Sequence, residues 1–88
     1  MTLSAIRIDA ADNVMCLLRD HIRGERPILA EGKGPALGQD VRLGHKVALT
    51  AIQTGEAVVK YGARIGQATK DIAPGDHVHL HNLAGDGL

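Results

Sequence analysis

The stretch IQTGEAV at positions 52–58 recurs twenty positions later as IAPGDHV at positions 72–78, and a looser copy, IRGE, stands at positions 22–25. Each copy begins with an apolar residue, passes through a turn that contains a glycine, and reaches an acid. The two longer copies then continue into a β-compatible run. This recurrence predicts short units of turn and strand that build a compact barrel or a clip of β-hairpins. The alternative is that turn residues recur here by chance.

Short β-compatible runs also lie outside these copies. Residues 14–18 (VMCLL) form a continuous apolar run that is either a buried strand or one helical turn. The segment 31–38 (EGKGPALG) predicts a mobile surface loop without regular structure, because it contains glycines and a proline. The sequence therefore predicts an all-β fold with at most one short helix near Val14 to Ile22. The other expected strands are residues 4–8, 46–49, 57–60, 64–68 and 77–80.

Length and charge limit the classes of protein to which the chain can belong. It has 88 residues, with ten basic and ten acidic side chains and a formal net charge of +0. This balance argues against a nucleic acid or an anionic membrane as partner. Charged residues such as Arg7 and Asp9 interrupt any signal-like run near the start, and no apolar run approaches the ~18–20 residues of a spanning helix. We therefore expect a soluble, cytoplasmic protein with a single domain over residues 1–88.

Histidines are concentrated near the end of the chain, at His77, His79 and His81. On a β-strand these positions share one face, with neighbours about 6.5–7 Å apart. Two such imidazoles can bind one metal ion at ~2.0–2.1 Å per nitrogen, whereas three on a straight strand cannot. At most two of the three therefore share an ion unless the strand bends. The alternative is a solvated strand face that carries histidines without a function.

Two further places could carry chemistry. His45 and Lys46 follow a turn glycine, where a histidine can transfer protons near neutral pH and a lysine can hold a carboxylate. Lys60 and Tyr61 could supply a cation and a phenol. The alternatives are a pair of solvated turn residues in the first case and a tyrosine that packs on the core in the second.

Taken together, these motifs resemble a known family. The runs GHKVAL at 44–49, VKYG at 59–62 and DIAPGDHVHLHN at 71–82 are similar to the amino-terminal SAF-type domain of the altronate and galactarate dehydratases. The resemblance implies a β-clip fold and a part in a lyase that removes water from a sugar acid. In that family the small domain precedes a much larger catalytic region, and it also occurs as a free-standing subunit, as in sulfolactate sulfo-lyase. The resemblance thus implies a two-chain enzyme whose small subunit is inactive alone.

The family motifs assign roles to the positions that match them. His45, His79 and His81 are the implied catalytic residues, and His79 and His81 are also the implied metal ligands. His77 matches no fixed position of the motif and is left out. The implied cofactor is a divalent cation. Fe²⁺ is the first choice, and Mn²⁺ and Mg²⁺ are the alternatives. The implied substrate-binding residues are Lys46, Lys60 and Asn82.

The implied partners are the large catalytic subunit and a sugar-acid substrate, and the isolated chain could form a homo-oligomer. Three other functions remain open from the sequence. The chain could be the small subunit of a sulfolactate sulfo-lyase, in which sulfite leaves in place of water. It could be a module that binds a carbohydrate acid or a metal without catalysis. It could also be a structural domain that promotes assembly.

Overall fold

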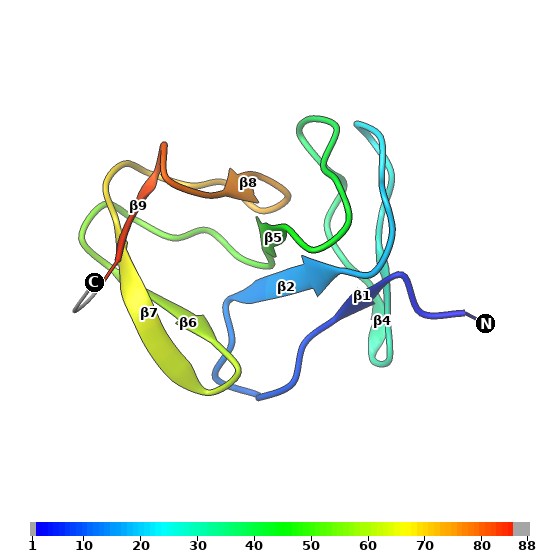
Figure 1. Ribbon diagram of the computed structural model, residues 1–88, viewed down its shortest axis with the longest axis horizontal. Coiled ribbons are helices and arrows are strands. Elements are labelled where there is room, and N and C mark those ends of the chain that lie inside the picture. The colour runs from blue at the N-terminus through cyan, green and yellow to red at the C-terminus, as the bar shows by residue number, and fades with distance from the viewer. Residues whose placement is uncertain (1, 86–88) are drawn as a thin grey trace.

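A computed structural model describes residues 2–85, and all of its regular elements are short β-strands (Figure 1). The all-β prediction is confirmed, and residues 14–17 of the run at 14–18 form a strand rather than a helical turn. Within the described range no helix is long and apolar enough to cross a membrane. The expected domain over residues 1–88 extends beyond this range by Met1 and residues 86–88. The strands are β1 (Ala5–Ile6), β2 (Val14–Leu17), β3 (Ile28–Leu29), β4 (Gly32–Lys33), β5 (Lys46–Ala48), β6 (Ala57–Lys60), β7 (Ala63–Ala68), β8 (His77–Val78) and β9 (Leu83–Gly85).

The strands form three antiparallel sheets, in the orders β1-β2-β5-β8, β3-β4 and β6-β7-β9. In the four-stranded sheet Met15 lies opposite Val47, and Val14 lies opposite Ala48. Side chains alternate across a strand, so these two pairs face opposite sides of the sheet. Each side has its own apolar cluster, one with Met15 and Val47 and one with Val14 and Ala48. Burial on both sides explains why β2 is apolar at every position.

The repeated stretch is confirmed as a repeated structure, with four copies instead of the three seen in the sequence. Each copy has a glycine with φ between 86° and 88°, a backbone conformation that glycine adopts readily. The turns pair through isolated bridges, His21 with Val41 and Ile52 with Ile72. Figure 1 shows the first pair as the cyan and green loops that project side by side. The four glycines are Gly24, Gly44, Gly55 and Gly75.

The same backbone clamp holds all four turns. In the third copy, the N–H of Gly55 donates to the carbonyl of Ala68, whose own N–H donates back to the carbonyl of Glu56. The other three copies make the same two bonds to residues in other parts of the chain, namely Leu37, Leu17 and Ala48. Each turn is therefore fixed by long-range contacts, and the residue after each glycine has a defined position.

Segment 31–38 was wrongly expected to lack regular structure. It begins inside a hairpin, because β3 and β4 pair through Ile28 with Lys33 and Leu29 with Gly32. Leu37 is 3% exposed and belongs to the core. Glycine and proline are strong signals for turns, but they do not prevent a two-residue strand or a single buried anchor in the same segment.

Candidate functional site

Three histidines from two distant segments converge at one edge of the four-stranded sheet. His45 lies directly before β5, His77 begins β8, and His79 follows β8. The Nδ1 atom of His45 and the Nε2 atom of His77 are 2.9 Å apart in a hydrogen bond. One ligand nitrogen from each of the three rings lies within 4.8 Å of the others. We call His45, His77 and His79 the histidine cluster.

The pairing of β8 with β5 brings His77 next to His45, and the chain bends directly after β8. The expected strand over 77–80 ends at Val78, and the chain then turns through residues 79–82. Asn82 holds the bend: its side-chain oxygen accepts from the N–H of His79, and its side-chain NH₂ donates to the carbonyl of His77. Asn82 is only 5% exposed. These contacts favour a positioning role for Asn82 over the substrate contact that the resemblance implies.

His45 occupies a position that carries an acid in the other three turns. There the carboxylates of Glu25, Glu56 and Asp76 each accept from the N–H of the residue three positions earlier, at 2.8, 2.6 and 2.9 Å. The corresponding donor in the second copy is Arg42, and no side chain of residues 2–85 accepts from its N–H. The imidazole of His45 contacts His77 instead. A residue that closes the turn elsewhere is thus replaced here by one that faces the cluster.

The surroundings keep His77 uncharged at neutral pH. Desolvation, followed by the positive charge of the nearby histidines and of Lys46, lowers the pKa of His77 from 6.5 to about 4. Burial, together with the charge of Lys60, also lowers the pKa of Lys46, while Cys16 opposes this shift. A neutral imidazole can bind a metal ion, so His77 is available as a ligand, whereas a pKa this low makes it a weak proton acceptor.

The remaining predicted site residues lie around the cluster. The ring of His81 lies 5.5 Å from that of His77 between centroids, but His81 is not part of the group whose nitrogens approach one another. Lys60 places its Nζ 4.9 Å from the centroid of the Tyr61 ring and acts on Lys46 through its charge. His77 is left out by the family motif, and the pairing of β8 with β5, in which His77 lies opposite Val47, brings it next to His45.

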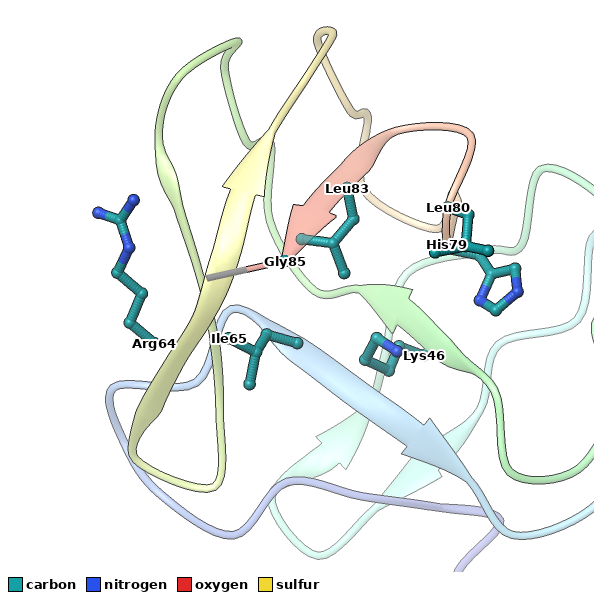
Figure 2. Close-up of a pocket in the computed structure, with 7 residues that line it drawn as sticks. All are labelled: Lys46, Arg64, Ile65, His79, Leu80, Leu83 and Gly85. Atoms are coloured by element: carbon teal, nitrogen blue, oxygen red, sulfur yellow. The ribbon is translucent and has the colours of Figure 1, made fainter. Parts of the chain in front are cut away.

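A hollow of about 420 Å³ adjoins the cluster and shares His79 with it. In Figure 2, His79 and Lys46 lie on one side, Ile65 and Leu83 lie next to them, and the guanidinium of Arg64 points away from the others. We call this the β8–β9 hollow. It is lined by Lys46, Arg64, Ile65, His79, Leu80, Leu83 and Gly85.

The donor set of the cluster decides which of the expected ions fits. Imidazole nitrogens suit Fe²⁺ and Zn²⁺, whereas Mg²⁺ prefers oxygen ligands. Two nitrogens bound to one ion at ~2.1 Å stand ~3.0–3.4 Å apart, close to the 2.9 Å between His45 and His77. The cluster therefore fits Fe²⁺ far better than Mg²⁺, and it leaves room for further ligands.

The sequence matches the family described as the altronate/galactarate dehydratase SAF domain over residues 3–86. The chain belongs to this family. The SAF domain is 44% identical to an altronate dehydratase of Bacillus subtilis over 79 residues, which cover 90% of this chain and 16% of that protein. It is 48% identical to an altronate dehydratase of Escherichia coli over 77 residues, or 88% of this chain and 15% of that protein.

A third relative is a short protein. The SAF domain is 49% identical to the (2R)-sulfolactate sulfo-lyase subunit alpha of Paracoccus pantotrophus over 43 residues, which are 49% of this chain and 64% of that protein. The SAF domain therefore matches a small part of the long altronate dehydratases and most of a protein named as a subunit. Two of these relatives are dehydratases by name, and the third is a sulfo-lyase subunit.

Proposed function

We propose that this SAF domain is the small part of a cytoplasmic sugar-acid dehydratase of the altronate and galactarate type, and that a larger catalytic polypeptide completes the active site. The observation that carries the proposal is the convergence of His45, His77 and His79 beside Lys46, in a chain that belongs to this family. The hollow next to these groups is partly open, which leaves a face for a larger polypeptide to cover.

The cluster has the groups that elimination of water from a hydroxy acid needs. A proton must leave the carbon next to the carboxylate, and the hydroxyl on the next carbon must depart. Two histidines of the cluster would hold the ion, and the third would take or return a proton. Lys46 can hold the carboxylate. Fe²⁺ would polarise the oxygen atoms that gain negative charge.

A sulfolactate sulfo-lyase is the second candidate, because the domain matches most of a subunit alpha of that enzyme. The elimination is the same in outline, with sulfite as the leaving group. A module that binds a carbohydrate acid or a metal without catalysis is the third. The three candidates differ in whether a catalytic polypeptide is needed and in which acid reacts.

The test is a hybrid enzyme in which residues 3–86 of this chain replace the matching segment of the Escherichia coli altronate dehydratase. We expect the hybrid to turn over altronate or galactarate in the presence of Fe²⁺, and the 88-residue chain alone to turn over neither. Turnover of sulfolactate but not of the sugar acids, by this chain paired with the remaining sulfo-lyase subunit, would favour the second candidate. A folded hybrid without any lyase activity would contradict the proposal.

A further inference from the structure

The β8–β9 hollow has a polar side and an apolar side. Lys46 and His79 form the polar side, next to the histidine cluster. Ile65, Leu80 and Leu83 form the apolar side. A sugar acid carries hydroxyl groups that an apolar surface cannot satisfy. The apolar side is therefore poorly suited to the substrate that the polar side would bind.

Leu80 is the most exposed of the large apolar residues in the described part of the chain, at 80%. It lies in the turn between β8 and β9, and these are the outermost strands of two different sheets. The neighbouring His79 is a member of the cluster. An exposed apolar surface beside a functional group is typical of a protein interface.

The comparisons indicate which chain covers this surface. The matched segment is 15–16% of the altronate dehydratases, so those enzymes have a further region of the same chain that is several times longer than this domain. In the sulfo-lyase the matched segment lies in a subunit of its own. In both kinds of relative the matched segment is therefore one part of a larger enzyme. The incomplete ligand set of the cluster needs groups from such a partner or from the substrate.

We propose that the apolar side of the β8–β9 hollow is the docking surface for the catalytic polypeptide of an altronate-dehydratase-type enzyme, which packs apolar side chains on Ile65, Leu80 and Leu83. The inference rests on the proposed function. Docking at this place puts Lys46 and His79 at the seam between the two parts, so the substrate is held between them. It also removes water from the cluster side of the seam.

Hydrogen exchange tests the docking apart from the activity. Amide exchange of residues 79–85 is compared between the 88-residue chain and the hybrid enzyme. We expect it to be ~10-fold slower or more in the hybrid, because the partner covers this turn. In the hybrid, Leu80→Asp should return the exchange toward that of the free chain and lower turnover. Ile8→Asp is the matched control, since Ile8 is 62% exposed and is not part of the hollow.

The outcomes separate the two proposals. Protection of residues 79–85 in a hybrid that has no turnover would support the docking surface and contradict the proposed function. Turnover in a hybrid whose residues 79–85 exchange as in the free chain would overturn the docking surface alone. Equal effects of Leu80→Asp and Ile8→Asp would also overturn it. Co-purification of this chain with a separately tagged catalytic polypeptide is a second measurement that does not depend on the fusion. We expect Leu80→Asp to reduce it, and co-purification that Leu80→Asp leaves unchanged would overturn the docking surface.

Discussion

Replacing His45 with glutamate should strengthen the fold and abolish the function. In two of the other turns a glutamate at this position accepts a hydrogen bond from the backbone, at 2.8 Å for Glu25 and 2.6 Å for Glu56. The His45→Glu side chain can make the same bond to the N–H of Arg42. A hydrogen bond to a charged group contributes about 1.5–3 kcal/mol, and solvent exposure of this turn reduces the expected gain to about 1 kcal/mol.

The comparison that isolates this gain is between His45→Glu and His45→Ala. Both variants lose the contact with His77, so that loss cancels. We expect the unfolding free energy of His45→Glu to be about 1 kcal/mol higher than that of His45→Ala. This difference corresponds to a melting temperature ~4–8 °C higher for a domain of this size. Urea unfolding and thermal melts of the 88-residue chain, with a chelator present, measure the difference.

The reciprocal change supplies the control. Glu56→Ala should lower the unfolding free energy by a similar amount, and Glu56→His should do no better, because an imidazole does not replace the carboxylate acceptor. In the hybrid enzyme both His45 variants should lose turnover. Two results would refute the reasoning that the four turns are equivalent. The first is a His45→Glu variant that is no more stable than His45→Ala, and the second is a Glu56→Ala variant that is as stable as the original chain.

Three further predictions concern other parts of the structure. Gly75→Ala should destabilise the domain by ~2 kcal/mol or more beyond Gly55→Ala, because both glycines have φ +88 but only at Gly75 would a Cβ collide with the Ala36 carbonyl; similar melting temperatures would contradict this. His77 has its pKa lowered from 6.5 to about 4, so the unfolded state binds more protons between these values and stability should fall as pH falls through that window. After allowance for solvent screening the loss is about 1 kcal/mol, and a His77→Gln variant with the same pH slope in urea titrations would count against it. Asn82→Ala should cost about 1–3 kcal/mol and weaken Zn²⁺ binding in calorimetry, since the bend after β8 loses both side-chain hydrogen bonds; unchanged Zn²⁺ affinity would show that the bend does not position the histidines.

The sequence predicted the elements of the fold well because turns and strands leave local signals. The glycine, the apolar anchor and the acid identified three of the four turns. The copy at Val41–His45 escaped notice because its acid position is a histidine, and its relation to the others becomes visible only through the shared backbone clamp. The role of Leu37 in the core was also not predicted, since a segment rich in glycine gives no sign of a single long-range anchor.

The candidate site was predicted only in part. His45, Lys46 and His79 could be named in advance from the family motifs, and the structure brings them together. His77 could not, because the motif has no fixed residue there and the pairing of β8 with β5, which sets it beside His45, is a long-range contact. The bend held by Asn82 depends on a side chain that reaches back three and five positions, which spacing alone does not reveal.

The most direct test of the central claim is the turnover of altronate by the hybrid enzyme with single alanine substitutions at His45, His77, His79 and His81, each shown to be folded. We expect a loss of ~10²-fold or more at His45, His77 and His79, because each of them either holds the ion or does the acid–base work, and a much smaller loss at His81. The family motif alone predicts instead that His81 matters and His77 does not. Turnover near that of the unmodified hybrid in the His45, His77 and His79 variants would contradict the claim that the histidine cluster is the functional site.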